Sequence, residues 1–551
     1  MGHLTTLATC SLNQWAMDFI GNQKNIIESI RQAKAKGASI RVGPELEITG
    51  YGCLDHFLES DTLLHTWESL AEIIDHPDCQ DILLDIGAPV RHRDVVYNCR
   101  CIVYNKQILL IRPKMSLAND SNYYEARYPG INYGLDGVEI LSNSSGSHWE
   151  LRKLHTRVEL IRGATTKAGG IYLYANQQGC DGERMYYDGC AMIVVNGKIV
   201  AQGSQFSLHQ VEVVTATVDL EEVRTYRNFK SRNMQAINQP SFERIEVDIS
   251  LSDDAEDVDT SIAPTQEIEV KYHLPEEEIS LGPACWMWDF LRRSRQAGFF
   301  LPLSGGVDSC ATAVIVHQMT RLVFKAVTED KDPQAISDML RIVGEPSTST
   351  WRPTCPQDIA TRMFHTTYMG MKENSSPDTR KRAADLAATI GAYHIDLDID
   401  TVYHALVTLF TTVTTFVPKY SMYGGTPAAR LRMVMAYLLA QLLPTVRQRN
   451  AKNPENPNPG SLLVLGSANV DESLRYNYSL LLPGEYDCSS ADINPIGGIS
   501  KIDLKRFILW ADGSFDMPLL KSFVSAPPTA ELLPITEAYV QDDGKSIRKL
   551  L

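Results

Sequence analysis

The first half of the chain alternates apolar runs with a segment of helical periodicity. Residues 26–35 repeat apolar side chains at helical spacing, and Gly37 follows where a helix commonly ends. The apolar runs are short enough to be strands, and the last of them reads as a hairpin that turns at Asn105-Lys106. These runs cover residues 4–12, 39–42, 82–88 and 95–111. The pattern predicts a mixed α/β domain built around a layered sheet.

The second half resumes this alternation after a polar break. Residues 250–267 are acidic and poor in apolar side chains, which predicts a solvated connector. Pro275 then opens a helix whose first turn carries three glutamates. The strands and helices that follow predict a doubly wound parallel sheet, with strands at residues 299–303, 393–397 and 461–466. We therefore expect a first domain over residues 1–250, a linker over residues 251–275 and a second domain over residues 276–551.

One turn of the second half has the composition of a phosphate site. Its first strand runs into Ser304-Gly-Gly-Val-Asp-Ser309, and an apolar helix follows. Gly305 and Gly306 can take positive φ angles, so backbone N–H groups can converge on an anion beside the positive end of the helix. The serines supply hydroxyl groups, and Asp308 supplies a hard oxygen for Mg²⁺. The alternative is an ordinary strand–helix turn, which a lone Gly-Gly pair would favour.

Two charged residues stand at predicted strand ends in the first half. Glu45 follows the strand at residues 39–42, and Lys114 closes the apolar run that begins at Ile108. A carboxylate and an amine at such positions can act as a general base and as a cation that stabilises an oxyanion. Either one alone is usually a solvated surface residue, so the surrounding motifs must decide.

Composition narrows the classes of function. With 44% hydrophobic and 22% charged residues the chain is an ordinary globular protein, and no run approaches the roughly 18 apolar residues of a membrane span. The net charge of −15 argues against a general nucleic-acid binder, whose surface would be basic. The 11 cysteines show no zinc-site spacing, which predicts a reduced, cytoplasmic protein. The expected partners are small-molecule substrates and further copies of the chain, with no nucleic acid and no membrane.

The motifs of the first half resemble the glutamine amidase domain that eukaryotic glutamine-dependent NAD⁺ synthetases share with the nitrilase superfamily. The resemblance implies an α-β-β-α layered fold in which Glu45 is the general base and Lys114 stabilises the oxyanion. The segments that carry it are Gly43-Pro-Glu45-Leu-Glu-Ile-Thr-Gly-Tyr51, Arg112-Pro-Lys114, Tyr133-Gly-Leu-Asp-Gly-Val-Glu139, Asn143-Ser-Ser-Gly-Ser-His148, Asn176-Gln-Gln-Gly-Cys-Asp-Gly182 and Tyr187-Asp-Gly-Cys190.

The chain departs from this family at the nucleophile. The family has a cysteine between the lysine motif and the Gly-Leu-Asp-Gly-Val segment, whereas residues 115–133 join the two here and contain no cysteine. Cys180 and Cys190 match other family positions. The loss predicts that glutamine hydrolysis is abolished. Further shortened segments, before Arg430, after Glu472 and at the C-terminus, leave a non-catalytic homologue, or a splice or gene-model variant, as the alternative.

The second half resembles the synthetase domain of the same family, and its glycine turn resembles the PP-loop of N-type ATP pyrophosphatases. The resemblance implies a doubly wound parallel sheet, ATP and Mg²⁺ as cofactors, and Ser304 as a catalytic residue. Asp308 and Glu472 would hold the metal. Substrate would contact Arg430, Asp492 and Lys501, and ATP would contact Pro302, Leu303, Ser304, Gly305, Gly306, Val307, Asp308 and Ser309.

The reaction implied by this resemblance is amide formation by a ligase. ATP adenylates the nicotinate carboxylate of deamido-NAD⁺ with loss of pyrophosphate, and ammonia then displaces AMP. In the family the ammonia comes from glutamine. With the nucleophile missing, free ammonia is the expected source for this chain.

Overall fold

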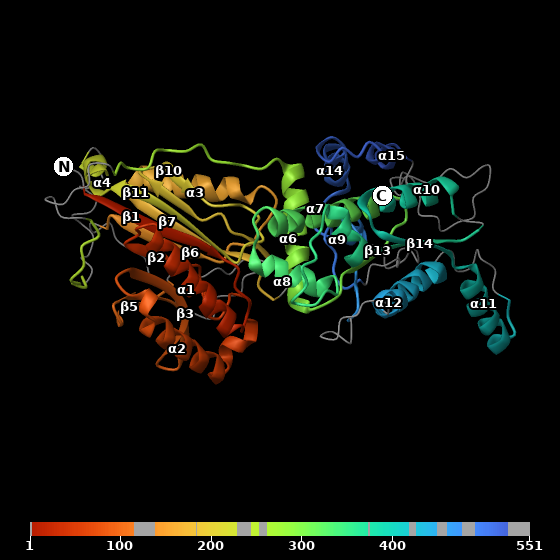
Figure 1. The fold of residues 1–551 in the computed structure, drawn as a ribbon, viewed down its shortest axis with the longest axis horizontal. Helices are drawn as coiled ribbons and strands as arrows, with labels where there is room; N and C mark the ends of the chain where they lie inside the picture. Colours follow the sequence, from red (N-terminus) through yellow and green to blue (C-terminus); the bar gives the residue numbers. More distant parts are fainter. Residues whose placement is uncertain are drawn as a thin grey trace. The chain divides into compact units, whose positions relative to one another are not determined.

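A computed structural model of the chain describes nine stretches of residues that form two compact units, Met1–His273 and Leu274–Leu551 (Figure 1). Both units mix helices and strands, which confirms the predicted fold class. Across these stretches the structure contains no helix with the length and apolarity that a bilayer crossing requires. The described residues are 3–114, 138–182, 185–228, 244–252, 262–372, 375–417, 426–448, 460–476 and 491–526.

Eleven strands form one sheet in the described part of the first unit. The main path runs β10-β9-β7-β1-β2-β3-β4-β5, while β11 pairs with β1, and β6 and β8 pair with β7. The strands are β1 (Leu4–Leu12), β2 (Ile40–Val42), β3 (Leu83–His92), β4 (Val95–Tyr104), β5 (Gln107–Pro113), β6 (Ile140–Ser145), β7 (Ile171–Cys180), β8 (Tyr186–Asp188), β9 (Met192–Val195), β10 (Lys198–Gln202) and β11 (Val211–Asp219).

The apolar cores of this unit define four layers, α-β-β-α. One core packs α1 (Phe19–Ala35) and α2 (Ser60–Asp75) against β1, β3 and β4. A second lies between strands, with β1 and β2 against β7, β9 and β11. A third packs α3 (Lys153–Ala168) against β7, β9 and β10. Strand β1 is buried on both faces, since Leu7 joins the middle core while Ala8 and Cys10 join the first.

The predicted hairpin is present as β4 and β5, and its turn lies at Asn105 and Lys106. Both residues have positive φ angles, 41° and 66°, which a two-residue hairpin turn of type I′ requires. This hairpin carries Lys114 to the end of β5. Short elements complete the unit: the 3₁₀ turns η1 (Leu54–Leu58) and η2 (Pro77–Cys79), and α4 (Leu220–Asn228).

The second part of the predicted solvated linker is hydrogen-bonded to the first unit. The backbone N–H of Thr265 donates to the Thr217 carbonyl at 2.8 Å, and that of Ile268 donates to the Ile199 carbonyl at 2.8 Å. Residues 265–273 therefore follow β11 and β10, and the division between units falls at His273. Residues 253–261, the acidic centre of the predicted linker, lie outside the described residues.

The described part of the second unit has a parallel four-stranded sheet in the order β14-β13-β12-β15. Helix α12 packs on one face with the core around Phe300 and Val464, while α7 contacts α6, α9, α10 and α14. The strands are β12 (Phe299–Pro302), β13 (Phe364–Gly370), β14 (Tyr393–Asp398) and β15 (Leu463–Val464). The helices are α6 (Pro275–Ser294), α7 (Val307–Thr328), α8 (Pro333–Ile342), α9 (Pro356–Met363), α10 (Pro377–Ile390), α11 (Asp400–Thr414), α12 (Thr426–Gln448), α13 (Val470–Tyr476), α14 (Lys501–Ser514) and α15 (Leu520–Ser525).

Candidate active sites

Glu45 lies just after β2 and is surrounded by hydrogen-bond donors. Its Oε1 accepts from the Lys114 ammonium and from the Asn98 amide, both at 2.6 Å. Its Oε2 accepts from the Gly146 backbone N–H at 3.1 Å. The carboxyl is buried, with 4% of the residue exposed, and these three donors, one of them charged, satisfy both of its oxygens inside the protein. The structure therefore brings the predicted base and the predicted cation into direct contact.

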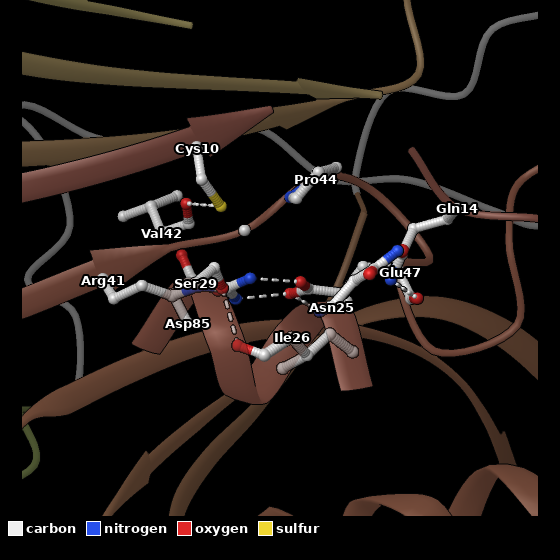
Figure 2. Close-up of polar contacts among 12 residues, drawn as sticks. Cys10, Gln14, Asn25, Ile26, Ser29, Arg41, Val42, Pro44, Glu47 and Asp85 are labelled. Atoms are coloured by element: carbon white, nitrogen blue, oxygen red, sulfur yellow. Dashed lines mark hydrogen bonds and ion pairs between the residues drawn. The ribbon is translucent and has the colours of Figure 1, made fainter. Parts of the chain in front are cut away.

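A buried ion pair supports the turn that carries Glu45 (Figure 2). Arg41 and Glu47 lie on either side of that turn, fully buried, and pair through two bonds of 2.9 and 2.7 Å. Arg41 Nε also donates to Ser29 Oγ at 3.0 Å, and the Gln14 amide donates to the Glu47 carbonyl at 2.8 Å. The backbone on both sides of Glu45 is thus held by charged and polar contacts inside the core.

Sequence reasoning missed three of the groups around Glu45. Glu47 lies in the motif around Glu45, but nothing in the local sequence shows that it pairs with Arg41. Asn98 lies on β4 and reaches Glu45 only through the strand pairing. Gly146 acts through a backbone N–H, which has no signal in the sequence.

None of the cysteines described around this site has the properties of a nucleophile. The segment expected to have lost the family cysteine, residues 115–133, lies outside the described residues. Cys180 and Cys190 are fully buried. Burial raises the pKa of the Cys190 thiol to about 12, so this thiol stays protonated at neutral pH.

In the second unit the Ser304–Ser309 turn joins β12 to α7, as the sequence predicts. Gly305 has a φ angle of 79°, and a Cβ there would lie 2.3 Å from the Thr379 carbonyl oxygen, so only glycine fits. The two serine hydroxyls lie 3.0 Å apart, and the Gly306 N–H points at Ser304 Oγ at 3.4 Å. Helix α7 begins at Val307 and aims its first N–H groups into this turn.

Asp308, Glu472 and Lys501, which are far apart in the sequence, meet beside this turn. The Lys501 ammonium lies 3.0 Å from Asp308 Oδ2 and 3.6 Å from Glu472 Oε1. The Asn469 amide donates to both carboxylates, at 2.9 Å each. Burial lowers the pKa of Lys501, but the attraction and hydrogen bonds of the two carboxylates outweigh it and leave this pKa above its usual value.

The pair formed by Asp308 and Glu472 fits Mg²⁺. This ion takes hard oxygen ligands and commonly uses one or two carboxylates, with substrate phosphates and water completing its shell. No group of three or more His, Cys, Asp or Glu residues arranged for a metal occurs within the ranges that the structure describes. Asn469, which directly precedes α13, holds both carboxylates.

The two other predicted substrate residues have different surroundings. Asp492 Oδ2 accepts from the Val464 backbone N–H at 2.8 Å, and its Oδ1 accepts from the Tyr437 hydroxyl at 3.3 Å. This carboxylate therefore ties its segment to β15 and α12. Arg430 lies in the first turn of α12 with an exposed side chain.

Two family models match the chain, carbon-nitrogen hydrolase over residues 6–127 and 121–228 and NAD synthase over residues 284–546. The glutamine-dependent NAD(+) synthetase of Saccharomyces cerevisiae is 51% identical over 98% of this chain and 83% of its own length. The chain belongs to the glutamine-dependent NAD(+) synthetases. The enzyme of the same name from Mus musculus is 49% identical over 98% of this chain and 80% of its own length. These ligases form NAD⁺, and the comparisons support this function and not the non-catalytic alternative.

Solved structures show the same fold. A glutamine-dependent NAD(+) synthetase from Cytophaga hutchinsonii superposes with a TM-score of 0.71 at 22% identity, covering 100% of this chain and 87% of its own. The enzyme from Acinetobacter baumannii, in complex with adenosine diphosphate, superposes with a TM-score of 0.68 at 18% identity. This match covers 96% of this chain and 86% of the other.

The comparisons also support the predicted internal deletions. The alignment with the Saccharomyces cerevisiae enzyme spans 609 positions, more than the 551 residues of this chain, so the relative contains internal segments that are missing here. The carbon-nitrogen hydrolase match is split into two pieces that meet at residues 121–127. This break lies inside the segment where the nucleophile is expected and absent.

Proposed function

We propose that this chain synthesises NAD⁺ from deamido-NAD⁺, with Mg·ATP as the activating substrate and free ammonia as the nitrogen source. The observation that carries the proposal is the contrast between its two sites. The turn at Ser304–Ser309 keeps its glycines and serines, and its Asp308 shares the Lys501 ammonium with Glu472. The amidase site keeps Glu45 and Lys114, but the cysteine of its family is missing from residues 115–133.

In the synthetase site the phosphates of ATP would lie in the turn at Gly305 and Gly306, against the N-terminal end of α7. The adenosine diphosphate bound to the Acinetobacter baumannii enzyme supports a nucleotide site in this fold. Asp308 and Glu472 would hold Mg²⁺, which neutralises phosphate charge when bound. The hydroxyl of Ser304, fixed against Ser309, would orient a phosphate oxygen.

The chemistry needs two displacements. A carboxylate oxygen of the nicotinate group attacks the α-phosphorus of ATP, the bond to the β-phosphate oxygen breaks, and pyrophosphate leaves. Ammonia then attacks the carbonyl carbon of the adenylate, AMP leaves with the bonding electrons, and one proton is released. Lys501, Arg430 and Asp492 are proposed to contact the substrates. The protein contributes mainly position and charge stabilisation, as in other phosphoryl transfers.

In the amidase site a base and an oxyanion donor are insufficient to split glutamine. The family reaction passes through a thioester, which requires a cysteine thiolate. Cys190 is buried and protonated, so it offers no replacement. We therefore expect no ammonia to be released from glutamine by this chain.

The decisive assay supplies ATP, Mg²⁺ and deamido-NAD⁺ with either glutamine or an ammonium salt, and measures NAD⁺ and AMP. Product should form with ammonium and stay near the no-nitrogen background with glutamine. The variant Asp308→Asn should lose the ammonium-dependent reaction, and Cys190→Ala should keep it. Comparable rates with the two nitrogen sources, or no product with either, would refute the proposal.

We also propose that the chain works as a homo-oligomer in a reducing compartment such as the cytoplasm. The ten cysteines that the structure describes form no disulfide with one another. Helix α11 buries only Tyr403 of its side chains, while Leu409 and Val413 are 61% and 76% exposed. Apolar side chains exposed in this way favour association between copies. Analytical ultracentrifugation over a range of concentrations tests this.

A further inference from the structure

Lys501 is held in place at both ends. Its backbone N–H donates to Asp471 Oδ2 at 2.9 Å, and it is the first residue of α14, which Ser500 caps. Its ammonium reaches the Asp308 and Glu472 carboxylates at 3.0 and 3.6 Å. The side chain therefore spans from the start of its own helix to the two carboxylates that the proposed function assigns to the metal.

The position of Lys501 matters because it offsets the negative charge of the two carboxylates. Asn469 is fully buried and fixes both carboxylates through one amide group, so the two negative charges cannot move apart freely. Two carboxylates that accept from the same amide group repel each other, and a cation nearby offsets this repulsion. Lys501 supplies one, and a divalent ion at the same oxygens would have to displace the ammonium or bind close to it, where the two cations repel each other.

A nucleotide changes this balance. The phosphates of ATP bring several negative charges to the neighbouring Ser304–Ser309 turn, and an ammonium released from the carboxylates can bind them. Metal on the carboxylates then balances their two negative charges, and lysine on the phosphates offsets one of the negative charges there. In the nucleotide-free protein no such anion is available to accept the ammonium.

Resting on the proposed function for its metal ligands, we propose that Lys501 is an internal counter-ion that keeps divalent cations off Asp308 and Glu472 until nucleotide binds. Metal binding thereby becomes dependent on nucleotide. Lys501 is a positioning residue in this role. A purely structural lysine that only anchored α14 would affect stability, without any effect of this sign on cation affinity.

The test measures Mn²⁺ binding to the nucleotide-free protein by electron paramagnetic resonance. The wild type should bind Mn²⁺ weakly at this site. Lys501→Met should bind it about tenfold more tightly or better, the change expected when one competing charge contact is removed at a partly buried site. The matched control is Lys505→Met, which removes the same charge from an exposed position one turn along α14. Its Mn²⁺ affinity should equal that of the wild type.

Additional variants distinguish a wrong metal assignment from a wrong role for Lys501. Lys501→Gln, which keeps a hydrogen-bond donor, should show the same gain and replaces Lys501→Met if that variant does not fold. Adding Asp308→Asn to either should abolish the gain. If the gain survives Asp308→Asn, the metal assignment of the proposed function is wrong. If Lys501→Met and Lys501→Gln bind Mn²⁺ no more tightly than Lys505→Met, while Asp308→Asn weakens Mn·ATP binding, the assignment stands and the counter-ion role is overturned.

Discussion

Glu47 is a charged residue buried within the core of the first unit, and its pairing with Arg41 contributes to the stability of that unit. We expect Glu47→Gln to lower the free energy of unfolding by about 3–5 kcal/mol, because the buried Arg41 guanidinium would lose the carboxylate that it contacts directly. Urea denaturation monitored by circular dichroism measures this. The matched change Glu68→Gln, on an exposed carboxylate that pairs with His65, should shift the same quantity by less than about 0.5 kcal/mol. A similar effect of both variants would contradict this view of the ion pair.

His317 is the residue for which a pH dependence follows most directly. It is 4% exposed on α7 against the Phe515 ring, and burial, with a smaller effect of Arg321, lowers its pKa to about 4. The unfolded chain protonates this histidine near its ordinary pKa of about 6.5. The stability it contributes is therefore complete above about pH 6.5 and is lost as the pH falls towards 4, by roughly 3 kcal/mol in total.

The test of this dependence is His317→Phe, which keeps a ring against Phe515 and cannot titrate. Between pH 7.5 and 4.5 the second unit of the variant should lose less stability in denaturant titrations than that of the wild type. The free energy of unfolding of the variant should still fall somewhat with pH, because burial and the neighbouring Arg447 lower the pKa of His365 to about 3. Equal slopes for variant and wild type would count against a neutral, buried His317.

At the scale of elements, the turn between β12 and α7 depends on one glycine. Gly305→Ala would place a methyl group against the Thr379 carbonyl of α10 and force a positive φ on alanine. We expect a cost of about 1–3 kcal/mol in stability and a clear loss of Mg·ATP affinity in calorimetric titrations. Gly306→Ala is the matched control, since its nearest neighbour would be the Ser304 hydroxyl at 3.5 Å. If both variants bind Mg·ATP like the wild type, the turn is not the phosphate site.

Elements whose signals are local could be predicted from the sequence. The turn at Asn105 and Lys106, the start of α6 at Pro275 and the Ser304–Ser309 turn are specified by residues adjacent in the chain. The binding of residues 265–273 along β11 and β10 could not be predicted, because a polar stretch gives no sign of which strand edge it will follow. The same holds for the pairing of β1 with both β2 and β11, which depends on the whole sheet.

In the candidate sites, too, residues in local motifs could be predicted, whereas contacts that depend on the fold could not. Asp308, Glu472 and Lys501 were found through motifs, and the fold places them in contact. Asn469 was missed because an asparagine before a helix already has an ordinary explanation as a cap. Its bonds to both carboxylates arise from the meeting of α7 and α13, which no local pattern encodes.

At the scale of the whole molecule, the proposed synthetase site keeps its glycine turn and paired carboxylates, whereas the proposed amidase site lacks the cysteine of its family. The Glu45 carboxylate, the Lys114 ammonium and the Gly146 N–H form their contacts without the segment that carries the family nucleophile. We therefore predict that restoring the segment restores glutamine hydrolysis. In the chimera, residues 115–133 are replaced by the segment that the Saccharomyces cerevisiae relative has between the same two motifs.

The chimera should release glutamate from glutamine, and the unchanged chain should not. Glutamate release is the appropriate measurement because it depends on the amidase site alone and requires no transfer of ammonia to the synthetase site. Changing the restored cysteine to alanine should return the rate to background, since the thiolate forms the acyl intermediate and the base and oxyanion donor act on it. A folded chimera that still makes NAD⁺ from ammonium but releases no glutamate would show that the contacts around Glu45 do not by themselves make a competent amidase site.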